Sequence, residues 1–182
     1  MTQASNLKSA AITNSDSLPV VENTTGEGAP GYLREIDGFV TALTGDTTAS
    51  TYRVIRVPTN AKVKALAIST AALSASTTLD VGLYYSDAPV GGVLDGTPPS
   101  LAGTLVSGQG TLFASAFAAT TANDNVSIIN QSGNNGIQLR NQPIWQTAGL
   151  ASDPGGYFDI VVVPHVTVVA GGIIGLKADY VD

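Results

Sequence analysis

Period-two alternation of apolar residues near the C-terminus sets the class of fold. The stretch YFDIVVVPHVTVVAGGIIGLKADYV holds two alternating runs, Phe158, Ile160, Val162, Val166 and Val168, then Ile174, Leu176, Ala178 and Tyr180. Side chains two apart lie on one face of a strand, so each run predicts a strand with one buried face. The Gly171-Gly172 pair between the runs predicts a turn, and we expect the strands 159–169 and 173–181 to be adjacent and antiparallel. Pro164 lacks an N–H group, which predicts an edge position or a bulge.

Similar short runs recur along the chain. Leu79, Val81, Leu83 and Tyr85 alternate in TLDVGLYYS, and residues 52–57 and 63–69 form another candidate pair around Pro58-Thr59-Asn60. TLFASAFAA predicts a short helix, and Asn135-Gly136 in VSIINQSGNNGIQLR predicts a hairpin turn. Short strands with long connections, such as residues 88–110, favour an all-β fold, a single β-sandwich of the jelly-roll or Greek-key type. The expected core contains Leu79, Val81, Leu83, Ile160, Val162, Ile174 and Leu176.

Length and composition narrow the partners. The 182 residues suit one domain, without cysteine for disulfides or thiolate chemistry. The net charge is −6, and nucleic-acid-binding faces need clustered Lys and Arg, so we expect no nucleic-acid partner. No apolar run approaches the roughly 20 residues that span a bilayer, so we expect no membrane partner.

The first 31 residues differ from the rest. They are rich in Ser, Thr, Asn, Ala and Gly, a composition that cannot bury its own core. We predict an extended N-terminal arm at 1–31 and a β-sandwich domain at 32–182. The arm is expected to pack little against its own sandwich and to order on a partner through Leu18, Pro19, Val20, Val21 and Tyr32. The alternative is a loose terminus.

No residue pattern predicts catalysis. The only histidine, His165, lacks companions for a metal site, and we interpret it as structural. No Gly-x-Ser-x-Gly motif is present, and the carboxylates are scattered. We therefore predict no catalytic, cofactor-binding or metal-binding residues, and a protein that is not an enzyme.

Half of the eight basic residues lie within residues 53–64, at Arg53, Arg56, Lys62 and Lys64. Period two places Arg56 on the face of Tyr52 and Val54, and Arg53 on the opposite face. Two interpretations stay open. The cations pair with acids of the same chain, or Arg53 and Arg56 contact an acidic patch on another subunit or partner.

Three stretches carry a resemblance. They are REIDGFVTALTGDTTASTYRVIRVPTNAKVKALAISTAALSASTTLDVGLYYSD, IWQTAGLASDPGGYFDIVVV and AGGIIGLKADYV, from about residue 32 to the C-terminus. In order and spacing they resemble the cement or decoration proteins of tailed bacteriophages. The resemblance implies a capsid-binding jelly-roll sandwich, located on the capsid surface after assembly in the host cytoplasm. It implies two partners: the major capsid protein and further copies of the chain, as a trimer rather than a dimer.

Two other functions stay open at this stage. A receptor- or carbohydrate-binding jelly-roll module at the base of a head or tail fibre would need an exposed aromatic platform, for which Tyr84, Tyr85 and Trp145 are the candidates. A small hydrolase would need two carboxylates or a histidine dyad converging in a pocket.

Overall fold

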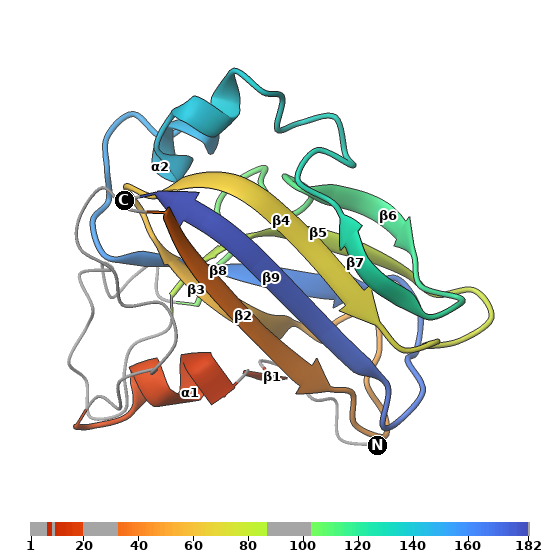
Figure 1. The fold of residues 1–182 in the computed structure, drawn as a ribbon. Coiled ribbons are helices and arrows are strands. Elements are labelled where there is room, and N and C mark those ends of the chain that lie inside the picture. Colours follow the sequence, from red (N-terminus) through yellow and green to blue (C-terminus); the bar gives the residue numbers. More distant parts are fainter. Residues whose placement is uncertain (1–6, 9, 20–32, 87–102, 182) are drawn as a thin grey trace.

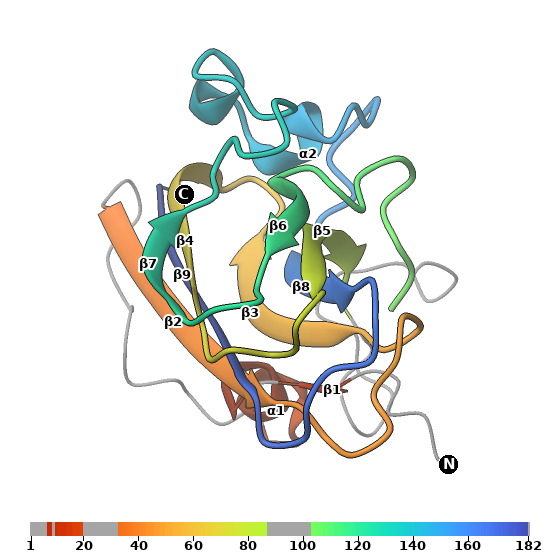
Figure 2. The same ribbon diagram turned by 90° about the vertical axis from the view of Figure 1, so that its right-hand side faces the viewer.

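Two β-sheets face each other across one core (Figures 1 and 2). In the computed structural model, the described residues are 7–8, 10–19, 33–86 and 103–181. The first sheet contains, in spatial order, β1 (Leu7–Lys8), β3 (Tyr52–Pro58), β8 (Tyr157–Pro164), β5 (Thr78–Tyr85) and β6 (Ala114–Ala118). The second contains β2 (Leu33–Thr41), β9 (Ile173–Val181), β4 (Lys62–Thr70) and β7 (Asn123–Ser127). Short helices are α1 (Ala10–Asp16), the 3₁₀ turn η1 (Leu139–Asn141) and α2 (Ile144–Thr147).

Strands β2 to β9 are wired as a jelly roll. Their orders are β2-β9-β4-β7 in one sheet and β3-β8-β5-β6 in the other, so successive strands change sheet except at β5–β6. This interleaving is the double Greek key of the jelly roll. The predicted all-β sandwich is confirmed.

The predicted strand pairings around two turns are wrong. β8 and β9 lie in different sheets, and the turn before β9 is tied to the end of β2, where Gly171 N–H donates to Ala42 O and Ala42 N–H to Gly172 O, both at 2.8 Å. Likewise β3 and β4, on either side of Pro58-Thr59-Asn60, belong to opposite sheets. Both turns are corners between layers, not hairpins.

Three local predictions also fail. The stretch predicted as a helix forms β6, which pairs with β5. The stretch around Asn135-Gly136 forms turns followed by η1 instead of a hairpin, and the Asn135 side chain donates to Ile129 O at 3.0 Å. β8 is central in its sheet, and Pro164 is its last residue, where a missing N–H does not interrupt the ladder.

The core lies between the inner faces of the sheets. All seven residues predicted for it are at most 2% exposed. Phe158 from β8 contacts Tyr85 from β5 with ring centroids 5.4 Å apart. The alternation therefore identified the inward faces correctly.

The outer faces of the two sheets differ. On the outer face of the first sheet, Asp159 and Val161 are fully buried. The loop after residue 103 covers part of this face and crosses Gly82, where an added Cβ would lie 2.2 Å from Gln109 O. On the second sheet, the outward Leu33, Phe39 and Ile173 are 66%, 62% and 48% exposed. The outer face of the first sheet is thus partly covered by the chain itself, whereas the outer face of the second lies open among the described residues.

Candidate interaction surfaces

A buried cluster of charges joins β3 to β8. Arg53 Nη1 donates to Asp159 Oδ2 at 2.5 Å, and Arg56 Nε donates to Asp159 Oδ1 at 2.6 Å. Arg53 also donates to Tyr85 O at 3.1 Å and to Gly103 O at 2.8 Å. Arg53 is 1% exposed, Arg56 is 6% exposed and Asp159 is fully buried.

A β-bulge explains why both arginines reach one carboxylate. Arg53 is opposite Val161 and Ile55 is opposite Ile160, so the register shifts at Val54. Because the extra residue reverses the alternation, Arg53 and Arg56 lie on the same face of β3. The period-two prediction of opposite faces is wrong for this reason.

Burial and attraction oppose each other in this cluster. Burial raises the pKa of the Asp159 carboxyl, while the charges and hydrogen bonds of Arg56 and Arg53 act to lower it. Burial by itself would lower the pKa of Arg56, but Asp159 and Asp16 outweigh it, and the net direction is upward. A buried charge is tolerated only when it is paired and hydrogen-bonded, as these groups are.

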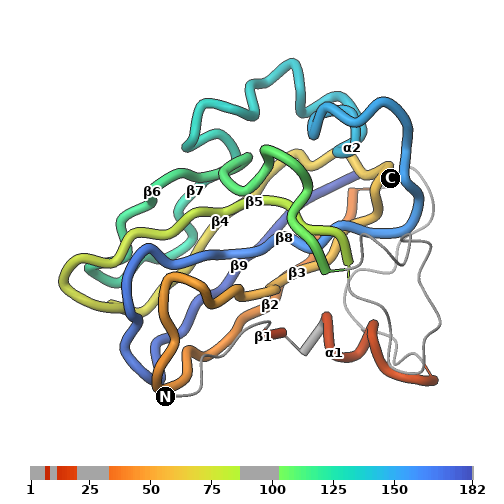
Figure 3. Tube along the Cα trace, turned by 180° about the vertical axis from the view of Figure 1, so that it is seen from behind, coloured from red at the N-terminus to blue at the C-terminus, as the bar shows by residue number. Residues whose placement is uncertain are grey.

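The N-terminal segment supplies the second acid of the cluster. Leu7–Lys8 pairs in parallel with β3, and Leu7 N–H donates to Thr51 O at 3.0 Å (Figure 3). Ile12 of α1 is fully buried, and Asp16 accepts from Arg56 Nη1 at 2.6 Å and from Lys8 Nζ at 2.7 Å. The expectation that this segment is extended and packs little on its own sandwich is therefore wrong for the described residues.

The predicted contact residues fall into three groups. Arg53 and Arg56 are buried in ion pairs with acids of the same chain, as the intramolecular interpretation proposed. Leu18 is 47% exposed and the exposed Pro19 follows it, so both are accessible to a partner. Val20, Val21 and Tyr32 lie outside the described residues.

A groove lies on the open outer face of the second sheet. Its volume is about 560 Å³. Phe39 of β2 and Asn123-Asp124 of β7 are among the residues that line it, together with Gly175 of β9 and Ser69 of β4. Alternation did place Gly175 outward, because its neighbours Ile174 and Leu176 face inward. The groove itself has no signature in the sequence, because its flanking strands come from distant parts of the chain.

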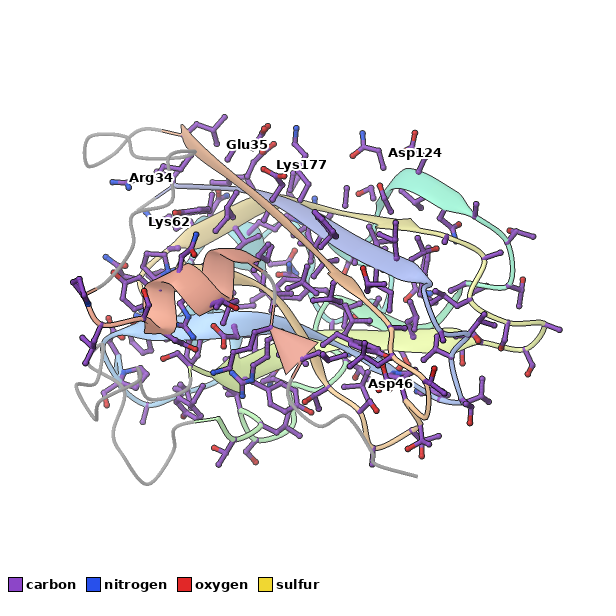
Figure 4. All side chains as sticks on the ribbon, turned by 90° about the horizontal axis from the view of Figure 1, so that it is seen from below. Arg34, Glu35, Asp46, Lys62, Asp124 and Lys177 are labelled. Atoms are coloured by element: carbon purple, nitrogen blue, oxygen red, sulfur yellow. The ribbon has the colours of Figure 1, made fainter. Side chains whose placement is uncertain are left out.

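Among the residues that line this groove, carboxylates outnumber cations. Asp37, Asp124 and Lys177 line it, and Figure 4 shows Asp124 and Lys177 on the outer side of the sheet together with Glu35. Lys177 Nζ lies 2.5 Å from Glu35 Oε2, and this hydrogen bond raises the pKa of Lys177, with Asp179 and Asp37 adding to the rise. The Lys177 ammonium is therefore already matched by acids of its own sheet.

The three candidate aromatics do not form an exposed platform. Tyr85 is 7% exposed and packs on Phe158. Tyr84 is half-buried, with its ring centroid 5.7 Å from the Arg53 guanidinium, and the half-buried Trp145 packs against the core. The geometry thus gives no support to sugar binding through these residues.

Within the described ranges, no group of three or more His, Asp or Glu side chains is placed to hold a metal ion. His165 Nε2 lies 2.7 Å from Asp80 Oδ2, and Asp80 Oδ1 accepts from Ala116 N–H at 2.9 Å. This carboxylate thus links β5 to β6 and to the residue after β8, which suits the structural role expected of His165. No helix in the described part of the chain is long and apolar enough to span a membrane.

Comparison with known proteins gives structural likeness only. No family model and no curated protein matches the chain. A chain in the capsid of Ralstonia phage GP4 superposes with a TM-score of 0.60 and 16% identity, covering 96% of each chain. A chain in the capsid asymmetric unit of cyanophage Pam1 gives a TM-score of 0.48 at 15% identity, covering 87% of this chain and 91% of that one. At these identities the likeness to the GP4 chain shows a shared fold.

Proposed function

We propose that this chain is a structural protein of a bacteriophage virion, and that it binds the outside of the capsid and stabilises it by bridging coat subunits. The observation that carries the proposal is the likeness to a chain in the capsid of Ralstonia phage GP4 over 96% of both chains. The jelly-roll wiring and the resemblance to cement and decoration proteins support the same role. We propose no catalytic function.

The open face of the second sheet supports a role based on surface contact. Exposed Leu33, Phe39 and Ile173 lie on one face, although a monomer gains by covering such residues. The proposed partners are the major capsid protein and further copies of this chain, as a trimer rather than a dimer, because virion proteins occupy symmetric positions of a shell.

The proposed domain boundaries remain 1–31 and 32–182, with the N-terminal part given two roles. Its described residues pack on the same chain, where Leu7–Lys8 pairs with β3 and Asp16 accepts from Arg56. Leu18 and Pro19, followed by Val20, Val21 and Tyr32, are proposed to contact a neighbouring subunit. Attachment at several points of a lattice would strengthen weak single contacts.

Quantifying the chain in purified virions tests the proposal. We expect hundreds of copies, close to one per coat subunit, and capsids that lose DNA or shell integrity at a lower temperature when the protein is absent. Few copies per virion would instead indicate a fibre component, and absence from virions would refute the proposal. Light scattering on the purified protein would check the trimer, which a monomer in solution and on capsids would contradict.

A further inference from the structure

The groove on the second sheet has a glycine floor that the fold itself does not require. A Cβ added at Gly175 would lie 3.5 Å from Gly38 O and 3.7 Å from both Phe39 Cβ and Ser69 O. These are ordinary van der Waals distances, and Gly175 does not have a positive φ. Gly82 differs, because there an added Cβ would clash with the backbone of the chain.

Glycine inside a strand weakens the strand and often marks a place where another chain approaches closely. Gly175 lies at the centre of the sheet, since β9 pairs with β2 on one side and β4 on the other. Phe39, 62% exposed, is directly opposite Gly175 on β2 and offers an apolar wall beside the missing side chain. The site is therefore shaped for an apolar group that enters from outside.

The charges around the groove indicate which kind of partner it would bind. Glu35, Asp37 and Asp179 act on Lys177, and among the charged residues that line the groove the two carboxylates of Asp37 and Asp124 are set against one ammonium, that of Lys177. A positively charged side chain of a partner would therefore be attracted to the carboxylates that Lys177 does not neutralise.

A second copy of this chain matches such a surface poorly. Its net charge is −6. Arg53 and Arg56 are buried, Lys8 is bound to Asp16, and Lys64 donates to Arg140 O and Asn141 Oδ1. With Lys177, which is paired with Glu35, at least five of its eight basic residues are thus engaged internally, and two copies of the same acidic face would repel each other.

We propose that this groove binds an extended segment of another virion protein that places an apolar side chain over Gly175, against Phe39, and separate lysine or arginine side chains against Asp37 and against Asp124. This inference rests on the proposed function and assigns the surface through which the chain meets its capsid partner. Low charge at the centre and acids at the rim match the division of protein interfaces into an apolar core and a polar rim.

Binding of the full-length chain to purified capsids that lack it tests the groove. Gly175→Leu fills the floor and should weaken binding at least about tenfold, as loss of a central contact does. Asp37→Asn with Asp124→Asn should weaken binding several-fold and flatten its dependence on salt. The matched controls are Ile137→Ser, at a residue 75% exposed and away from the groove, and Asp153→Asn, at an exposed carboxylate elsewhere. Both should bind like wild type.

Photocrosslinking identifies the protein that occupies the groove, and it does not depend on the folding of the Gly175→Leu variant. Phe39 is replaced by photoreactive p-benzoylphenylalanine in the full chain, the protein is bound to capsids and irradiated, and Ile137 replaced in the same way is the control. We expect crosslinks from position 39 to a coat subunit at a peptide that contains Lys or Arg. Crosslinks to a second copy or to the chain itself would overturn the inference.

The outcomes separate the two proposals. If wild-type protein binds capsids and the groove variants, with unchanged melting temperatures, bind equally well, the groove inference is wrong and the proposed function stands. If wild-type protein does not bind capsids, both are wrong.

Discussion

Replacing Asp159 by Asn should destabilise the sandwich strongly, because it leaves two buried guanidinium groups without their shared counter-charge. Asp159 accepts three hydrogen bonds, from Arg53 Nη1 at 2.5 Å and from Arg56 Nε and Nη2 at 2.6 and 3.2 Å. Removing one partner of a buried ion pair costs about 3–5 kcal/mol. Each kcal/mol lowers the melting temperature of a domain of this size by about 2–4 °C. We therefore expect a fall of about 6–20 °C.

Thermal unfolding followed by circular dichroism measures this change, and Glu35→Gln provides the matched control. The Glu35–Lys177 pair has the same 2.5 Å separation, but its side chains are 58% and 47% exposed. Exposed pairs contribute little, so the control should melt like wild type. Equal melting temperatures for the two variants would refute the claim that burial makes the Asp159 cluster important.

Thermal unfolding also distinguishes the two interpretations of Arg53 and Arg56. If Arg53 and Arg56 are structural, Arg56→Lys should lower the melting temperature, because one ammonium cannot reproduce the contacts of the guanidinium with Asp159 and Asp16. Capsid binding of the variant that remains folded should then match wild type. A variant that melts normally and binds poorly would instead make these arginines partner contacts.

Further variants test the core, the N-terminal segment and the tyrosine hydroxyl. Leu83→Ala and Leu176→Ala should each cost about 2–5 kcal/mol of unfolding free energy in urea titrations, and wild-type values for both would mean that the inward faces are assigned wrongly. Ile12→Ala should lower the melting temperature, as should deletion of residues 1–31, whereas an unchanged value would show that the segment does not dock on its own sandwich. Burial raises the pKa of Tyr52 above its ordinary value of 10.0, and the hydrogen bond to Asp46 adds to the rise. The buried, protonated Tyr52 hydroxyl therefore stabilises the fold fully below about pH 10, and this stabilisation is lost as the pH rises further. Melting temperatures from about pH 8 to about pH 11 should therefore fall less steeply for Tyr52→Phe than for wild type, and parallel curves would contradict the raised pKa.

Which faces turn inward could be predicted because that depends on local alternation alone. Which strands pair could not, because pairing joins residues far apart in the chain. The sequence VVAGGIIG suggests a hairpin, yet the glycine turn bonds to Ala42, which follows β2, and β9 pairs with β2 and β4. A turn between layers and a turn within a sheet use the same residue types.

Tertiary contacts also overrode local propensity. Ala114–Ala118 is rich in alanine, the best helix former, but it forms β6 against β5. Ala116 has a φ of 51°, and its N–H donates to Asp80. A carboxylate about one-fifth of the chain away therefore holds this segment in a conformation that its composition disfavours.

The contact of both arginines with Asp159 could not be predicted, because it depends on one extra residue in β3. Strict alternation separates Arg53 from Arg56, and only the bulge at Val54 brings both to Asp159. A bulge has no signature in RVIRV, since it depends on how β8 pairs with β3. The interpretation that the cations pair within the chain was available from the surplus of acids, but the acids could not be named.

The groove likewise depends on residues that are far apart in the sequence, so it could not be predicted from local patterns. Alternation through Ile174, Leu176, Ala178 and Tyr180 already places Gly175 and Lys177 outward. What makes this glycine a floor is Phe39 of β2 on one side and Asp124 of β7 on the other, which jelly-roll wiring brings to either side of β9 and β4. In the first sheet the loop over Gly82 covers part of the outer face, and the N-terminal segment extends the sheet beside β3, where its Asp16 reaches Arg56. Because a glycine that the chain covers and a glycine that it leaves open look alike in sequence, only the fold distinguishes Gly82, which serves internal packing, from Gly175, which is accessible to a partner.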